Sequence, residues 1–179
     1  MAEGFELPET GEEHGNHPLV LPVSVTLSIL AVFIAAVTLL GHRAHTEELL
    51  LQSQATDQWA YYQAKNIRLH EMQSMVDLLG AITPLDKEKT AKLQEKYAKE
   101  VERYNGDKEN ISEKAKDLEK ERDLISHRAD RFDGGEALLE IGLVICSITL
   151  LTKRRGFWIG GITVALAGIV LAVTGFLLH

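Results

Sequence analysis

The chain has 179 residues, a formal net charge of −7 and a single cysteine. Residues 42–136 hold 16 of the 19 basic and 20 of the 26 acidic side chains, so the charges of this block nearly cancel and form no basic face. That balance argues against nucleic acid as a partner, and a lone cysteine excludes an intramolecular disulfide.

The amino-terminal residues 1–18 have five glutamates and no lysine or arginine, which predicts an acidic flexible tail. His14 and His17 follow Glu12 and Glu13 there, a combination that suits weak metal binding. We favour the simpler interpretation of a solvated tail.

The first apolar run, residues 19–41, has no charged side chain. The 22 residues from Leu19 to Leu40 reach about 33 Å as a helix, enough to cross a bilayer. It is longer than the apolar region of a signal peptide and has no basic residues before it, so we expect a retained anchor. Two further runs, 137–152 and 157–178, complete an all-α integral membrane protein with three transmembrane helices.

Each predicted span carries small side chains at helical spacing, which lets helices approach closely in lipid. We expect the spans to pack against each other, against copies of themselves, or both. The small residues are Ser24, Ser28, Ala31, Ala35 and Thr38 in the first span, Gly142, Cys146 and Thr149 in the second, and Gly161, Ala165, Gly168, Ala172 and Gly175 in the third.

Between the first two spans, the sequence predicts a long antiparallel coiled-coil helical hairpin. Its arms are residues 42–83 and 97–136, and its tip is 84–96. Apolar residues recur every seven positions, which is the coiled-coil repeat. They are Ala55, Tyr62, Leu69 and Val76 in the first arm, and Tyr97, Tyr104, Ile111, Leu118, Ile125 and Phe132 in the second.

The simplest register of this hairpin places Tyr62 opposite Leu118 and Val76 opposite Tyr104. Asn105-Gly106 interrupts the second arm and is a candidate kink. The charged flanks of the arms are interpreted as solvated faces with pairs at i,i+4.

Polar side chains gather where the arms meet the predicted membrane, and we call them the membrane-boundary polar collar. Imidazoles and carboxylates together suit a divalent metal or a pH response, whereas the simpler interpretation is an interfacial collar without either. Glu140 lies deepest and is either a functional carboxylate or an interfacial acid satisfied by Arg131 or His42. The collar comprises His42, His45, Asp133, Glu136 and Glu140.

The segment 56–65 has the most unusual composition of the chain, and four of its residues form a candidate interaction patch. Trp and Tyr are enriched at interaction hot spots, but packing within the hairpin or within an oligomer is the simpler interpretation, which we favour. The patch comprises Trp59, Tyr62, Gln63 and Lys65.

No phosphate loop, nucleophile elbow, zinc-protease motif or paired-cysteine motif is present, so no catalytic residue, metal or cofactor is inferred. The sequence predicts a non-enzymatic, membrane-anchored coiled-coil scaffold that self-associates or docks an unknown protein. The alternative is a subunit of a small channel or transporter complex, which Glu140, Thr149 and the glycines of the third span suggest.

Four segments of the chain resemble a known family: residues 42–52, 56–65, 128–133 and 152–158. This family of uncharacterised bacterial membrane proteins is catalogued as domain of unknown function 4337. The resemblance implies a bacterial inner-membrane setting and supplies no activity, cofactor or catalytic residue.

Orientation depends on the loop 153–156, which contains three consecutive basic residues. Short basic loops stay on the cytoplasmic side of a membrane. The hairpin is then expected on the extracytoplasmic side, although Arg43, Arg128 and Arg131 flank its base and argue the other way.

Overall fold

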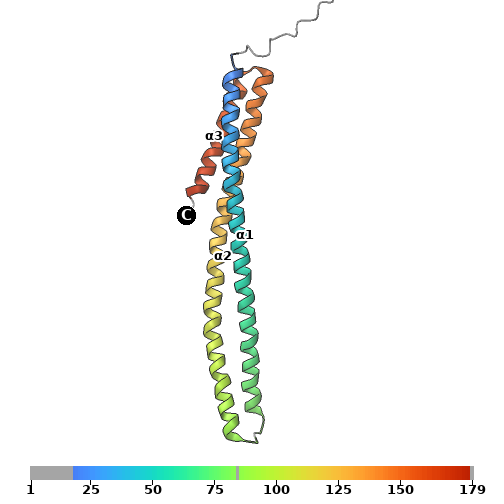
Figure 1. Cartoon of the computed structure of the whole chain (residues 1–179), viewed down its shortest axis with the longest axis vertical. Helices are drawn as coiled ribbons and strands as arrows, with labels where there is room; N and C mark the ends of the chain where they lie inside the picture. Colours follow the sequence, from blue (N-terminus) through green and yellow to red (C-terminus); the bar gives the residue numbers. More distant parts are fainter. Residues whose placement is uncertain (1–17, 84, 178–179) are drawn as a thin grey trace, which may run out of the picture. The chain divides into compact units, whose positions relative to one another are not determined.

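The structure, a computed structural model, describes residues 18–83 and 85–177. These residues form three helices, α1 (Val20–Ala81), α2 (Lys87–Thr152) and α3 (Arg155–Leu177), and contain no strand (Figure 1). The prediction of an all-α chain is confirmed. Each helix is long and apolar enough, by length and composition, to cross a membrane. The predicted acidic tail and its two histidines lie outside the described residues, except for Pro18.

The ends of the helices follow local chemistry. α1 ends at Ala81, directly after Gly80. α2 begins at Lys87, where a carboxylate oxygen of Asp86 accepts a 3.1 Å hydrogen bond from the backbone nitrogen of Lys89 and caps the helix. The tip expected at 84–96 is therefore helical from Lys87 onward. α2 also runs through Gly106 without a break, so the interruption expected there is absent.

The chain divides into two compact units, which we describe separately. The first comprises residues up to Arg43 together with those from Arg128 onward, and the second comprises Ala44–His127.

In the first unit, α2 and α3 approach through their small residues. A Cβ atom added to Gly142 would lie 2.8 Å from the carbonyl oxygen of Gly161 and 2.8 Å from the Cβ of Ala165, so neither backbone leaves room for a side chain. Such close approach maximises van der Waals contact between the two helices. This contact favours helix association even in lipid, where burying apolar surface gives no gain. The predicted small faces of the second and third spans are thus buried against each other: Gly142, Cys146 and Thr149 on α2, and Gly161, Ala165, Gly168, Ala172 and Gly175 on α3.

α1 packs in this unit by a different face from the one expected. Its small residues Ser24, Ser28, Ala31 and Ala35 are exposed, and only Thr38 is partly covered. Large side chains are buried instead, namely Leu19, Val23, Leu30 and Val37. Because the small faces of α2 and α3 already pair with each other, the surface left for α1 is filled by larger groups. Of the alternatives expected for the small face of α1, packing within the chain is not observed among the described residues, and packing against a second copy stays a prediction.

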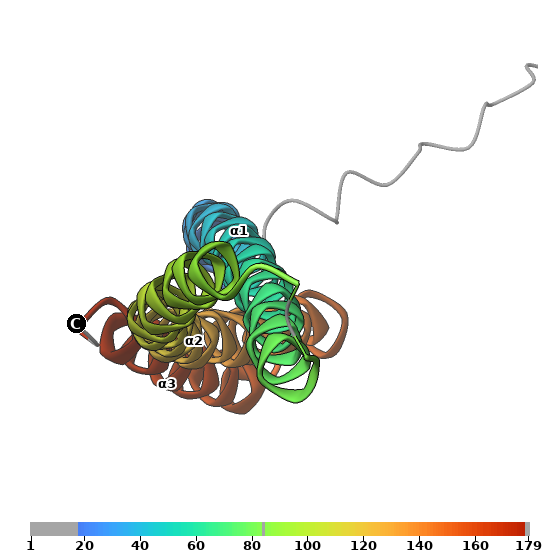
Figure 2. The same ribbon diagram turned by 90° about the horizontal axis from the view of Figure 1, so that it is seen from below.

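In the second unit, α1 and α2 run antiparallel and side by side (Figures 1 and 2). Four of the predicted heptad residues are buried here, namely Ala55 and Leu69 on α1 and Tyr104 and Ile111 on α2. Ala44, Leu51 and Ala115 are buried in the same unit.

The register of this helical pair differs from the predicted one by about one heptad. The Nζ of Lys108 lies 3.2 Å from the amide oxygen of Asn66, whereas the predicted register put residue 114 at that level. Lys65 with Asp107 and Gln52 with Arg122 agree with the same shift. A sequence that repeats every seven residues presents the same apolar face after a slip of seven, so the repeat defines the face but not the partner.

Candidate functional site

The aromatic side chains of the candidate interaction patch lie between the two helices of the second unit. The indole nitrogen of Trp59 donates a 2.8 Å hydrogen bond to a carboxylate oxygen of Glu119 on α2. The ring of Tyr62 meets that of Trp59 edge to face, with centroids 5.5 Å apart and planes at 78°. Both residues are half-buried. These contacts favour packing within the chain as the role of Trp59 and Tyr62.

Lys65 is held by an ion pair and two aromatic rings. Its Nζ lies 2.8 Å from Asp107 Oδ2, 5.0 Å from the ring centroid of Tyr104 and 5.4 Å from that of Tyr61. The hydrogen bond with Asp107 raises the pKa of Lys65, and the same bond lowers the pKa of Asp107. With 15% of its side chain exposed, Lys65 presents little charge to a partner.

Lys108 completes this set of contacts from α2. Its Nζ lies 5.6 Å from the ring centroid of Tyr62 and also donates to Asn66. A shallow groove of about 290 Å³ adjoins it, lined by Tyr62, Lys108, Glu109, Ser112, Glu113 and Lys116. The groove mixes two cations with two carboxylates, so it has no clear preference for one charge.

The α2 side of this cluster was not predicted from the sequence, because charged side chains on the second arm were interpreted as solvated. Glu119, Asp107 and Lys108 all meet groups on α1. One signal was present: Lys108 stands at a heptad seam position, where a charge needs a partner. Of the candidate patch, Gln63 alone is exposed, and the other three residues are partly buried.

Four collar residues belong to the first unit, and the structure brings two of them against α1. The hydroxyl of Thr38 donates a 2.6 Å hydrogen bond to Glu136 Oε1. Asp133 Oδ1 lies 3.3 Å from the position of a Cβ on Gly41, so that glycine makes room for the carboxylate. His45 belongs to the second unit, with its Nδ1 3.4 Å from Glu48. Among the described residues, no group of three or more His, Cys, Asp or Glu side chains is placed to hold a metal.

Glu140 lies deeper in the first unit than the rest of the collar. It is exposed, and it follows Leu139, whose backbone nitrogen is 3.0 Å from the Cβ position of Gly168 near the middle of α3. Arg131, one of its expected partners, instead directs its guanidinium to the Thr174 hydroxyl at 3.4 Å. The carboxylate of Glu140 therefore stands on the outside of the apolar unit at the depth of the α3 midpoint.

The described residues thus form a three-helix protein. One unit contains the apolar helix segments, and the other is a charged helical pair. The chain belongs to the family described as domain of unknown function DUF4337, whose model matches residues 21–178. This confirms the family resemblance. No curated protein and no solved structure matches the chain.

Proposed function

We propose that the chain is a membrane-anchored scaffold, in which the first unit crosses the bilayer and the second projects from it as a coiled-coil hairpin. One observation carries this proposal. In the second unit, Trp59, Lys65 and Lys108 all make contacts between the two helices. Groups used in this way stiffen a helical pair, which suits a spacer or docking arm.

The surface of the first unit supports a lipid environment. Large apolar side chains stand exposed around all three helices, for example Leu21 on α1, Leu151 on α2 and Val170 on α3. Soluble monomers rarely expose contiguous apolar patches of this kind, whereas bilayer hydrocarbon covers them without cost.

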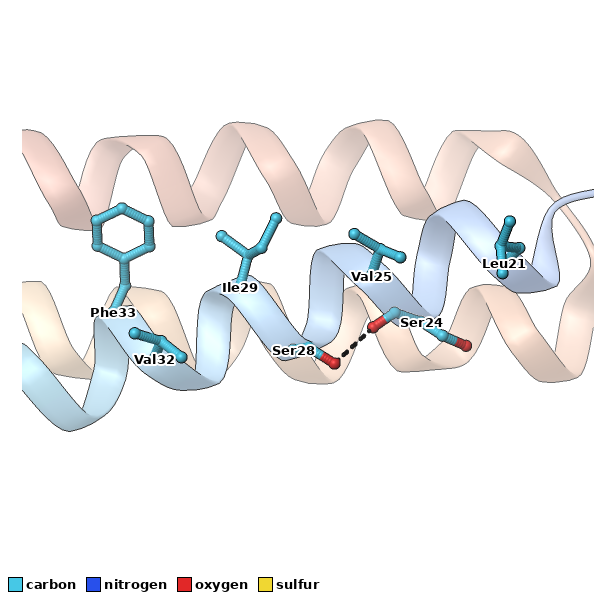
Figure 3. A pocket seen from close by; sticks show the side chains of 7 residues that line it. All are labelled: Leu21, Ser24, Val25, Ser28, Ile29, Val32 and Phe33. Carbon is cyan, nitrogen blue, oxygen red and sulfur yellow. Dashed lines mark hydrogen bonds between the residues drawn. The ribbon is translucent and has the colours of Figure 1, made fainter.

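Self-association in the membrane is supported by the exposed small face of α1. Figure 3 shows Ser24 and Ser28 directed to one side of the helix, away from Val25, Ile29 and Phe33. The Ser28 hydroxyl bonds to the carbonyl of Ser24 at 3.0 Å, so its polarity is satisfied within the helix. A small, satisfied and exposed face suits close approach of a helix from a second copy.

Oligomeric state tests this part of the proposal. The full chain, purified in detergent or placed in nanodiscs at several protein-to-lipid ratios, is expected to have the mass of a dimer or larger oligomer by light scattering. A monomer at every ratio would remove self-association from the proposal.

The proposed location is the bacterial inner membrane, with the second unit extracytoplasmic because three basic residues, Lys153, Arg154 and Arg155, follow one another between α2 and the body of α3. Single cysteines at Thr10 and Glu113, in a Cys146→Ser chain, report the two sides. A membrane-impermeant thiol reagent added to intact cells is expected to label position 113 and not position 10. The opposite pattern would place the arms, and any partner, in the cytosol.

A channel or transporter subunit is the second candidate, and the exposed carboxylate of Glu140 favours it. Carboxylates at such depth in membrane proteins mark ion paths or polar partners. Reconstituted wild-type chain would then give an ion flux that Glu140→Gln abolishes. Absence of flux in vesicles that contain the assembled chain would exclude this function.

A further inference from the structure

Arg128, on α2 in the first unit, is held by aromatic rings and not by a carboxylate. Its Cζ lies 5.8 Å from the ring centroid of Phe132 and 5.7 Å from that of Phe176 on α3. Its Nε is buried and has no hydrogen-bond partner within the described part of the chain. A guanidinium is permanently charged, and a charged donor removed from water is costly unless it is paired.

Arg131 adds a second cation to the same place. Residues three apart are neighbours on a helix surface, so the two arginines lie side by side on α2. The Nη1 of Arg131 donates a 3.4 Å hydrogen bond to Thr174 on α3, whose hydroxyl itself donates to the carbonyl of Leu171 at 2.6 Å. Neighbouring like charges on a helix repel each other, and an anion between them removes that repulsion.

The carboxylates of the first unit do not supply this anion. Glu136 accepts a hydrogen bond from Thr38, and Asp133 lies against Gly41, so both are directed to α1. Over residues 18–83 and 85–177, neither arginine forms an ion pair with a carboxylate; their contacts are two aromatic rings and one threonine hydroxyl.

The two arginines lie at one end of the apolar unit. A Cβ on Gly175, in the last turn of α3, would be 2.8 Å from the Cβ of Arg131. α3 has 23 residues and is about 35 Å long, so its end reaches the boundary of the hydrocarbon core, where lipid phosphates lie. Val173, Phe176 and Leu177 are exposed apolar side chains of the same end. A lipid meets both features, because it carries a phosphate and hydrocarbon together.

We propose that Arg128 and Arg131 form a binding site for the phosphate of an anionic phospholipid. The planar fork of arginine donates two parallel hydrogen bonds to phosphate oxygens, and basic pockets between membrane helices bind lipid headgroups. The rings of Phe132 and Phe176 orient one fork, and Thr174 orients the other. The inference rests on the proposed function in one respect, that the first unit crosses a bilayer.

The competing role for these arginines is to neutralise the carboxyl end of α3. The last carbonyl groups of a helix attract cations, with a strength equivalent to about half an elementary charge. Two guanidinium groups exceed that charge about fourfold. The carbonyls also leave the Nε of Arg128 without an acceptor. Helix-end attraction therefore accounts for only part of the charge at this site.

Melting temperature in mixed micelles tests the site. The full chain in dodecyl maltoside receives phosphatidylglycerol or phosphatidylcholine at equal mole fractions. A lipid that binds the folded state raises the melting temperature, so wild type is expected to melt higher with phosphatidylglycerol. Arg128→Gln and Arg131→Gln should each lose most of this difference. The matched control Arg154→Gln, which removes the same charge from an exposed position, should keep it.

Three outcomes would overturn the site. The first is an undiminished difference in Arg128→Gln, and the second is an equal loss in Arg154→Gln, which would indicate unspecific attraction. The third is a drop of the same size in both lipids for Arg128→Gln, which would give that arginine a structural role alone. Loss of an uncompensated charge should instead leave this variant at least as stable as wild type with phosphatidylcholine.

Retention of lipid, measured by native mass spectrometry, gives the affinity. Arg128→Gln is expected to bind phosphatidylglycerol at least about tenfold more weakly. Phe176→Leu preserves an apolar surface but removes one ring from the guanidinium, so a smaller loss is expected. Far-UV circular dichroism verifies that each variant keeps its helix content. Unchanged affinity in both variants would contradict the arrangement.

Inorganic phosphate distinguishes a lipid from a free anion. At matched ionic strength it is expected neither to raise the melting temperature nor to displace phosphatidylglycerol. Stabilisation by inorganic phosphate equal to that by the lipid would overturn the lipid as the ligand.

Carbonate extraction of cell membranes separates this inference from the proposed function. If carbonate releases the wild-type chain, the first unit does not cross a bilayer and both proposals fail. If the chain stays in the membrane but shows no preference for phosphatidylglycerol in micelles, the lipid site is wrong and the scaffold proposal stands.

Discussion

The indole nitrogen of Trp59 donates a 2.8 Å hydrogen bond to Glu119, which joins α1 to α2 in the second unit. Hydrogen bonds to charged groups contribute about 1.5–3 kcal/mol to stability, more than neutral ones. Trp59→Phe is therefore expected to lower the free energy of unfolding by about 2 kcal/mol.

Thermal unfolding of the full chain in detergent, followed by circular dichroism, measures that loss. The appropriate comparison is a double-mutant cycle with Glu119→Ala, in which the pair should lose little more than either single variant. Fully additive losses would show that Trp59 stabilises the unit by packing alone.

The register of the helical pair predicts which positions can be joined. Cysteines at Asn66 and Lys108, in the Cys146→Ser chain, are expected to react with a short bifunctional thiol reagent, because these side chains meet at 3.2 Å. The matched pair of Asn66 with Lys114 is about one heptad out of register and is expected to fail. Preferential cross-linking of the second pair would restore the register that the repeat alone suggests.

Neighbouring glycines on α3 provide a matched test of helix packing in the first unit. A Cβ on Gly161 would lie 2.7 Å from the carbonyl oxygen of Gly142, whereas a Cβ on Gly160 meets nothing within 4 Å. Gly161→Ala is expected to cost about 1–3 kcal/mol by overpacking. Gly160→Ala should be neutral or stabilise by up to about 1 kcal/mol. Equal melting temperatures for the two variants would contradict close packing of α2 on α3.

The Lys65–Asp107 ion pair gives the second unit a predictable pH dependence. Asp107 has a lowered pKa, so its contribution is present above the ordinary carboxyl pKa of about 3.9 and is lost as pH falls through the lowered value. Lys65 has a raised pKa, so its contribution is present below about 10.4 and is lost as pH rises through the raised value.

Asp107→Asn isolates this pair. The difference in melting temperature between wild type and variant should stay constant from about pH 5 to pH 9 and shrink on both sides of that window. A difference that does not change with pH would assign the effect of the substitution to packing. Glu95→Gln, which removes an exposed i,i+4 pair with Lys99, is the control and should change little at any pH.

On the exposed face of α1, the sequence pattern of small residues does not correspond to packing in the structure. Small residues mark a helix surface that permits close approach, and on α2 and α3 that surface is used within the chain. Ser24 and Ala31 have the same character but remain exposed, because the small faces of the other two helices are already paired. The sequence of α1 alone does not distinguish a buried small face from an exposed one, since the outcome depends on which faces of α2 and α3 remain open to pack against α1.

Local chemistry is sufficient for much of the architecture. Long apolar runs predicted the apolar helix segments, and the seven-residue repeat predicted the buried faces of Leu69 and Ile111. These features depend only on the rise and periodicity of a helix, which every stretch of sequence carries in itself. The sequence by itself therefore determined three helices, their apolar segments and their inner seams.

The tertiary structure decided the partners. It placed Lys108 beside Asn66, one heptad from the expected register, and it directed Trp59 to Glu119. A repeat is degenerate under a shift by its own period, so only the summed contacts of linker, seam and flanking charges select one alignment. The same holds for Glu140, whose depth beside the middle of α3 follows from how α2 packs and not from its own neighbours in the chain.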